Sequence, residues 1–178
     1  MSAAAHAHDG HAHHEEHEHH HHEEHWITKY VFSMDHKTIS RQFLVTAVIM
    51  ATLAMIMSML FRLQLAWPGE KFKIINYLLG DKWGKDGILD PGMYMALVTI
   101  HGTIMVFMVL TGGLSGTFSN LLIPYQVGAR DMASGFLNML SYWFFFLSSA
   151  FMIGGFFIET GPASGGWTVY HPRQVLFQ

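Results

Sequence analysis

A single histidine inside a long apolar segment is the first residue of this sequence that could carry chemistry. His101 lies in the segment Val98–Met105, which has no charged residue. An ionisable side chain at membrane depth is costly and usually faces a bundle interior, a cavity or a cofactor. Neutral imidazole is a common axial ligand of haem iron, although a hydrogen bond to a neighbouring helix would explain His101 equally well. Tyr94 lies seven residues earlier, on nearly the same helical face. It could belong to the same site, or it could be an aromatic residue that anchors the helix at the membrane interface.

A second group of polar residues lies around Asp131. Asn120, Asn138 and Ser141 are neutral polar residues that fall near the same membrane surface as Asp131. One interpretation is a water-filled entry for protons or ions. The alternatives are hydrogen bonds between helices and, for Asp131 and the adjacent Arg130, a surface ion pair, which contributes little stability.

The N-terminal tail has its own composition. Residues 1–25 hold eleven of the 14 histidines and six of the 13 acidic residues, with no Lys or Arg. The run His19, His20, His21 and His22 could bind zinc, copper or nickel while the imidazoles are neutral. Because the tail offers nothing apolar to bury, we expect it to be disordered. It also lacks the basic and apolar regions of a secretory signal.

The rest of the chain must position these residues inside a membrane. Of 178 residues, 51% are hydrophobic and only 13% charged, and the mean hydropathy is +0.24. Soluble domains carry about 25% charged residues. Without the tail, the remaining ten basic and seven acidic residues give a net charge of +3. The absence of cysteine excludes disulfides, thiolate metal sites and cysteine nucleophiles.

Three uncharged stretches are long enough to span a bilayer. They are Phe43–Phe61, Met93–Ile123 and Phe136–Ile158, and about 18 apolar residues suffice. The sequence therefore predicts an all-α polytopic membrane bundle over residues 26–170, with helices at about 39–63, 92–123 and 135–158. The second helix must tilt or extend beyond the bilayer. Residues 63–92, rich in Gly and Pro, are expected to form a loop.

Small residues cluster in the second stretch. Gly112 and Gly116 have a spacing that permits close helix contact or the close approach of a flat ligand. Lysine and arginine counts do not settle the orientation of the spans, because the lysines of residues 63–92 are interleaved with acidic residues.

Several spaced motifs, taken in order, resemble subunit I of the haem–copper terminal oxidases, the cytochrome c oxidase family. The segment Met-Asp-His-Lys-Thr-Ile is similar to the lead into that subunit's first helix, and Thr-Ile-His-Gly-Thr-Ile-Met-Val-Phe to the helix with a haem ligand. The resemblance covers residues 34–170, and its motifs lie at residues 34–39, 61–69, 99–107, 120–124, 128–133, 137–143 and 166–170.

The resemblance implies roles for individual residues. His101 would be an axial ligand of a low-spin haem, haem A by preference, with Arg62 as a donor to a peripheral haem group and Tyr94 in the same pocket. Asp131 would be the mouth of the proton-uptake channel, and Asn120 and Asn138 would order water inside it. The family's topology would place the N-terminus and Asp131 on the cytoplasmic side.

Some residues depart from the family pattern. Gln64 stands where many members have a glutamate that helps to hold a cation, and Ser134-Gly135 replaces the usual Phe-Pro. The motifs of the resemblance end at Tyr170, and residues 171–178 are expected to form an atypical end. Outside the tail only His36, His101 and His171 remain, too few for a second axial ligand, a high-spin haem ligand and three copper ligands. No catalytic residue is expected in this portion, and the chain alone is expected to be inactive.

The resemblance thus implies a portion of the catalytic subunit of a respiratory oxidase, an oxidoreductase that transfers electrons to oxygen through haem and copper with proton uptake and pumping. The high-spin haem and copper would require the remainder of that subunit. Expected partners are other oxidase subunits, membrane lipid and cytochrome c or quinol as electron donor, with no nucleic acid. The expected location is a bacterial inner membrane. Two alternatives stay open: a His-rich metal-binding or metal-transport membrane protein, and a non-catalytic assembly subunit.

Overall fold

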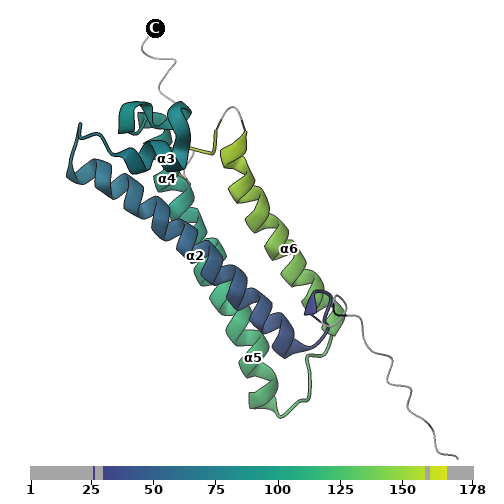
Figure 1. The fold of residues 1–178 in the computed structure, drawn as a ribbon. Helices are drawn as coiled ribbons and strands as arrows, with labels where there is room; N and C mark the ends of the chain where they lie inside the picture. The colour runs from purple at the N-terminus through teal and green to yellow at the C-terminus, as the bar shows by residue number, and fades with distance from the viewer. Residues whose placement is uncertain (1–25, 27–29, 159–160, 168–178) are drawn as a thin grey trace, which may run out of the picture.

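The computed structural model describes residue 26, residues 30–158 and residues 161–167. Within these residues the chain is helical without strands, and three helices are long and apolar enough to cross a membrane (Figure 1). The predicted fold class, an all-α bundle with three membrane-spanning helices, is confirmed. The tail of residues 1–25 and the end of the chain from residue 168 lie outside the described residues.

The first span is the helix α2 (His36–Ala66), which is longer than the predicted 39–63. It begins at His36 because Asp35 caps it: the Asp35 side chain accepts a hydrogen bond from the Thr38 N–H at 3.2 Å. An N-terminal cap of this kind satisfies one of the free N–H groups of the first turn. The helix ends just before Pro68.

The second span is continuous from α4 (Pro91–Thr103) through the π-helix η2 (Ile104–Leu114) to α5 (Ser115–Val127). Asp90 caps its start by accepting the Gly92 N–H at 2.9 Å. The helix continues past Pro124, since a proline removes one donor without preventing later residues from being helical. Gly128, with φ of 74°, ends it in the left-handed conformation that glycine favours.

The third span is α6 (Gly135–Gly154), followed by the short 3-10 helix η3 (Gly155–Phe157). Its first residue lies against the N-terminal segment, since a side chain on Gly135 would come within 3.0 Å of the Met34 carbonyl oxygen. The departure from the family pattern at Ser134-Gly135 therefore lets the chain before α2 lie close to the start of α6.

The prediction of a loop between the first two spans was wrong in one part. Residues Lys73–Trp83 form the helix α3, interrupted at Gly80, and Lys85–Gly87 form the 3-10 turn η1. The segment folds because Ile75 is fully buried between α2 and α4, together with Leu60 and Met93. The glycines and prolines of this segment indicated turns. Burial of Ile75 instead holds the residues between those turns in a helix.

The bundle is built around α2, which packs along α4, η2 and α5 and also contacts α6. Figure 1 shows α3 at the end of the bundle where α2 finishes, with the starts of α2 and α6 and the end of α5 at the opposite end. Three apolar clusters follow α2, centred on Leu60 near α3, on Met50 midway and on Phe43 at the opposite end.

The glycines of the second span let the helices approach each other. A side chain on Gly116 would meet the Phe43 ring at 2.7 Å, and Gly113 lies directly against Ala47, both on α2. Gly112 faces the Phe145 ring of α6, which a side chain there would meet at 2.5 Å. Of the two interpretations of this cluster, close helix contact is the one that the packing supports.

Candidate functional site

His101 lies in the last turn of α4 and is held against α2. Its Nδ1 lies 2.8 Å from the main-chain carbonyl oxygen of Ala54. A carbonyl oxygen can only accept a hydrogen bond, so Nδ1 carries the proton in the neutral ring and Nε2 keeps its lone pair. Histidines that ligate metals almost always donate their other ring N–H to a carbonyl or carboxylate in this way.

Aromatic rings border the His101 imidazole. Phe61 of α2 lies with its ring centre 5.5 Å from that of His101 and 6.2 Å from that of Tyr94, edge to face in both cases. The predicted pair His101 and Tyr94 is thus joined through Phe61. Arg62 is the next residue of α2 and is exposed, at the same end of the bundle as Tyr94. The structure thus places Phe61 and Arg62 of α2 and Tyr94 and His101 of α4 on neighbouring turns of the two helices.

The other face of α4 is fastened to the loop after α6. The Trp167 indole N–H donates to the Thr103 hydroxyl at 3.0 Å, and the Gly166 N–H donates to the Thr99 hydroxyl at 3.2 Å. Each threonine also donates to the carbonyl four residues earlier, at 2.8 Å in both cases. Because Thr99 and Thr103 lie about 200° around the helix from His101, α4 is held on two opposite sides.

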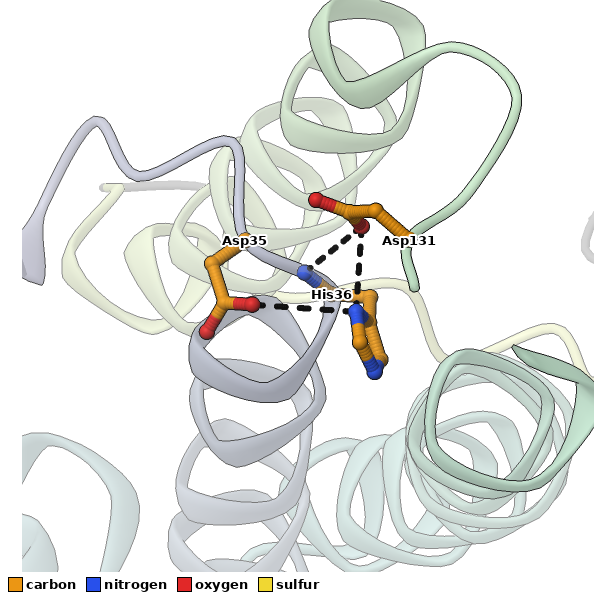
Figure 2. A group of neighbouring side chains, drawn as sticks. All are labelled: Asp35, His36 and Asp131. Carbon is orange, nitrogen blue, oxygen red and sulfur yellow. Dashed lines mark hydrogen bonds and ion pairs between the residues drawn. The ribbon is translucent and has the colours of Figure 1, made fainter. Parts of the chain in front are cut away.

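Asp131 lies in the connection between α5 and α6, beside the first residues of α2. Its Oδ1 accepts hydrogen bonds from the His36 Nδ1 at 3.0 Å and from the His36 main-chain N–H at 3.3 Å (Figure 2). Asp35 lies on the other side of the ring, with its Oδ1 3.6 Å from the same Nδ1. The His36 side chain is buried, while both carboxylates are half-exposed. The His36 Nδ1 is therefore hydrogen-bonded to Asp131 and lies within ion-pair distance of Asp35, at the surface of the bundle.

These contacts set the acidity of Asp131. Burial raises the pKa of its carboxyl, but hydrogen bonds from the Met132 N–H and from His36 outweigh burial, and the pKa lies below the usual 3.8. The Met132 N–H bond to Oδ1 is 2.7 Å long. Hydrogen bonds to a carboxylate favour its ionised form. Asp131 is therefore an anion at neutral pH.

The two predicted asparagines lie at the same end of the bundle as Asp131. Asn120 is buried on α5, where its Nδ2 donates to the Gly116 carbonyl at 2.7 Å, and Asn138 lies in the first turn of α6. Among the described residues, the buried side-chain N and O atoms without a hydrogen-bond partner all belong to this end: His36 Nε2, Gln42 Oε1, Asn120 Oδ1, Asn138 Nδ2 and Trp143 Nε1. Buried polar atoms nearly always bond to protein or to ordered water, so this end is suited to hold water.

Sequence reasoning missed the role of His36. The signal was a histidine directly after a helix-capping aspartate, in the segment 34–39 that carries part of the family resemblance, but the partner Asp131 is 95 residues away. Gln42 and Trp143 were missed too, because nothing local marks a buried polar atom without a partner. Ser141, in contrast, donates to the Asn138 carbonyl at 2.7 Å and is exposed. The candidate metal ligands His19–His22 lie outside the described residues.

Gln64, which departs from the family pattern, has a structural contact of its own. Its Oε1 accepts the Leu89 N–H at 3.2 Å and so ties the connection before α4 to the end of α2.

Comparison with known proteins shows which family this chain resembles in sequence. The chain is 41% identical over 151 residues to the alternative cytochrome c oxidase subunit 1 of Bradyrhizobium diazoefficiens, which covers 85% of this chain and 23% of that protein. It is 36% identical over 147 residues to a haem-copper oxidase subunit I+III of Aeropyrum pernix, covering 83% and 16%. It is also 36% identical over 151 residues to cytochrome c oxidase subunit 1 of Thermostichus vulcanus, covering 85% and 24%.

The chain thus spans between 16% and 24% of the length of these relatives. Residues 38–178 match the family described as cytochrome C and quinol oxidase polypeptide I. The matched range includes both candidate centres, with His101 on α4 and Asp131 before α6. This chain belongs to the cytochrome c and quinol oxidase polypeptide I family.

Proposed function

We propose that this chain is part of the catalytic subunit of a respiratory terminal oxidase, in which His101 ligates a low-spin haem and Asp131 receives protons from the cytoplasm. The whole enzyme would pass electrons from cytochrome c or quinol to oxygen and take up protons for that reduction. Such an enzyme would lie in a bacterial inner membrane with the N-terminus of this chain in the cytoplasm, and would contain further subunits.

The observation that carries the proposal is the hydrogen bond from His101 Nδ1 to the Ala54 carbonyl. It fixes the tautomer in which Nε2 can donate its lone pair to iron, and it holds the ring plane against α2. Because the donor atom lies in a membrane span beside the Phe61 ring, the site offers an apolar neighbour and a nitrogen ligand, both of which suit a haem. A bound haem supplies reversible one-electron chemistry at its iron.

The remaining haem residues would act from the sides. Tyr94 would pack in the same pocket through Phe61, and Arg62 would donate to a polar group at the haem edge, where its fixed guanidinium geometry suits an oxygen acceptor. The preference for haem A, with a formyl group as that acceptor, is part of the proposal. The high-spin haem and the copper would be bound by the parts of the subunit beyond this chain.

Proton entry rests on the end of the bundle around Asp131. A carboxylate that is half-exposed and ionised can take a proton from water, and the buried polar atoms of Asn120 and Asn138 can order water without titrating. The path would run from Asp131 into the bundle between α5 and α6. Coupling of this uptake to pumping is part of the proposal for the whole enzyme.

Two substitutions in the complete oxidase test the two centres. His101→Ala should abolish the low-spin haem absorption, while Met105→Leu, an exposed position one turn further along the same helix, should leave it unchanged. Retention of the low-spin signal in His101→Ala would refute haem ligation and favour a non-catalytic assembly role for this chain.

For the proton entry, Asp131→Asn should slow oxygen reduction and proton uptake together. Asp86→Asn is the control, because Asp86 is an exposed aspartate in the connection at the opposite end of the bundle. Normal proton uptake in Asp131→Asn would contradict the assignment of Asp131 as the mouth.

A further inference from the structure

The His36 side chain has one nitrogen at Asp131 and the other facing the interior. We propose that His36 is a positioning residue for proton entry: its Nδ1 and main-chain N–H hold the Asp131 carboxylate, and its buried Nε2 binds the first ordered water on the inner side. The inference rests on the proposed role of Asp131 as the proton mouth.

The outer half of this arrangement is a two-point attachment. Asp131 lies in an exposed connection, and a free aspartate there could rotate among several conformations. The bonds of 3.0 Å and 3.3 Å from one residue to the same carboxylate oxygen select one of them. His36 can serve as the fixed partner because it is the first residue of α2, follows the capping Asp35 and is only 2% exposed.

The inner half is the unpaired nitrogen. His36 Nε2 is buried and has no hydrogen-bond partner among the described residues. A buried polar atom of this kind is usually satisfied by ordered water, and such a water needs two to four polar partners. Asn120 Oδ1 and Asn138 Nδ2 are likewise buried and without a hydrogen-bond partner at this end of the bundle, so each of the three spans contributes a buried polar atom that ordered water could satisfy.

A surface ion pair is the simpler explanation of the contact, and burial argues against it. Pairs between solvent-exposed charges contribute little and leave both groups in water. Here the imidazole is buried and only the carboxylates are half-exposed. The ring therefore lies between solvent and the buried polar atoms.

His36 itself neither gains nor loses a proton in the proposed transfer. A proton from water forms an O–H bond on the Asp131 carboxylate, and this bond breaks when the proton passes to an inner water molecule. The carboxylate is restored and again accepts the His36 Nδ1–H. Because His36 holds both the carboxylate and the inner water, the distance of that transfer is fixed.

Other charged groups face this centre and must be considered in any pH dependence. Asp35 faces the ring from the residue before α2, at 3.6 Å. Tyr125 of α5 faces it edge-on, with ring centres 6.3 Å apart, and the Lys37 Nζ lies 5.7 Å from the centre of the Tyr125 ring. Arg130 precedes Asp131 in the chain. Among the described residues, the Asp131 carboxylate accepts hydrogen bonds from His36 and from the Met132 N–H.

Three substitutions of His36 in the complete oxidase separate its two nitrogens. The amide nitrogen of His36→Asn can replace Nδ1, that of His36→Gln can replace Nε2, and His36→Leu replaces neither. Two quantities are measured: the proton-uptake rate and the pH at which the Asp131 carboxyl C=O stretch appears in infrared difference spectra. That stretch is identified by its loss in Asp131→Asn.

We expect His36→Leu to slow proton uptake about tenfold, as removal of a supporting hydrogen-bond partner typically does, and to shift the Asp131 titration to higher pH. His36→Asn should keep the wild-type titration but still slow uptake. His36→Gln should show the shifted titration with uptake faster than in His36→Leu. Lys73→Gln, at an exposed position of α3 at the opposite end of the bundle, should match the wild type in both measurements.

Wild-type uptake with a wild-type titration in His36→Leu would overturn the inference. Equal slowing in all three variants with an unchanged Asp131 titration would also overturn it, because the two nitrogens would then have no separate roles. If Asp131→Asn slows uptake and His36→Leu does not, only this inference fails. If Asp131→Asn has normal uptake, the proposed function of Asp131 fails, whatever the titration in the His36 variants.

Discussion

The Nδ1 atom of His101 lies 2.8 Å from the carbonyl oxygen of Ala54, so a main-chain group of the first span fixes the tautomer of a histidine in the second. The same device recurs at the other end of the bundle, where the Nδ1 of His36 faces the Asp131 carboxylate at 3.0 Å. When either ring is neutral, its acceptor partner places the proton on Nδ1 and leaves Nε2 with a lone pair. Two histidines are thus oriented by hydrogen bonds to groups on other segments, His101 by α2 and His36 by the connection before α6.

The Phe61 ring should matter to the position of His101 without being a ligand. It is partly buried and packs on both His101 and Tyr94. We expect Phe61→Ala to retain the low-spin haem but to destabilise the protein by about 2–4 kcal/mol, because truncating a packed ring removes contacts and leaves a cavity. Thermal denaturation of the complete oxidase, followed by its haem absorption, measures both effects.

The control for this variant is Phe107→Ala, since Phe107 is half-exposed and packs on Trp167 instead. Complete loss of the low-spin signal in Phe61→Ala, as in His101→Ala, would contradict a packing role for Phe61.

The spans could be predicted from the sequence, and His101 and Asp131 could be named as candidate site residues, because their signals are local. An uncharged stretch of twenty residues has one stable solution in lipid, and a histidine within it stands out. The helix α3 was not predictable in the same way. Its fold depends on Ile75, which has no distinctive pattern in the sequence but is fully buried between two other helices.

The contacts around Asp131 depend on residues far apart in the chain. His36 and Asp131 meet because α5 ends at Gly128 and α6 restarts at Gly135 beside Met34, which brings the connection onto the start of α2. Sequence reasoning found the carboxylate and the two asparagines. It could not find the imidazole partner, because a separation of 95 residues carries no periodic signal.

The lowered pKa of Asp131 predicts a pH-dependent contribution to stability. A carboxyl whose pKa is lower in the folded state stabilises that state above its unfolded pKa, and the contribution is lost as pH falls through the folded value. We therefore expect wild type to melt at a higher temperature than Asp131→Asn at pH 7, with the difference beginning to fall near the usual pKa of 3.8 and vanishing below the lower folded value. The difference should be small and reduced by salt, because the side chain is half-exposed.

Melting temperatures of the two proteins between pH 7 and pH 3, at low and high salt, check this sign. Asp86→Asn, at the opposite end of the bundle, should show no such trend. A stability difference that grows toward acid pH would mean that the fold disfavours the ionised form of the Asp131 carboxyl. That result would contradict the hydrogen bonds that this carboxylate accepts in the structure.

Gly113 should tolerate no side chain. It is buried directly against Ala47 of α2, so an added group must push the two helices apart. Overpacking of this kind costs about 1–3 kcal/mol, and we expect Gly113→Val to lower the melting temperature and the yield of assembled oxidase. Gly154→Ala in α6 is the matched control, since a side chain there meets nothing within 4 Å. Equal behaviour of the two variants would show that the approach of α2 to η2 is not tight.

The loop after α6 should stabilise α4 through its two hydrogen bonds to threonines. Trp167 donates to Thr103 at 3.0 Å and its ring packs on Phe107 at 5.4 Å between centres. Thr103→Val keeps the side-chain shape but removes both the acceptor for Trp167 and the hydroxyl's own bond to the Thr99 carbonyl, so we expect a loss of about 2 kcal/mol, about 1 kcal/mol for each hydrogen bond. Trp167→Phe should lose a similar amount for the hydrogen bond and somewhat more for the smaller ring.

The two changes should not add, because each removes the same hydrogen bond. A double-mutant cycle on the complete oxidase, with unfolding followed by heat, should give a coupling energy of at least 0.5 kcal/mol, as for residues in contact. Thr111→Val is the control on the same span, because Thr111 is exposed and lies two turns beyond Thr103. Strict additivity of Thr103→Val and Trp167→Phe would mean that the indole bonds elsewhere in the whole enzyme. In that case the loop would hold α4 only through the hydrogen bond from the Gly166 N–H to the Thr99 hydroxyl.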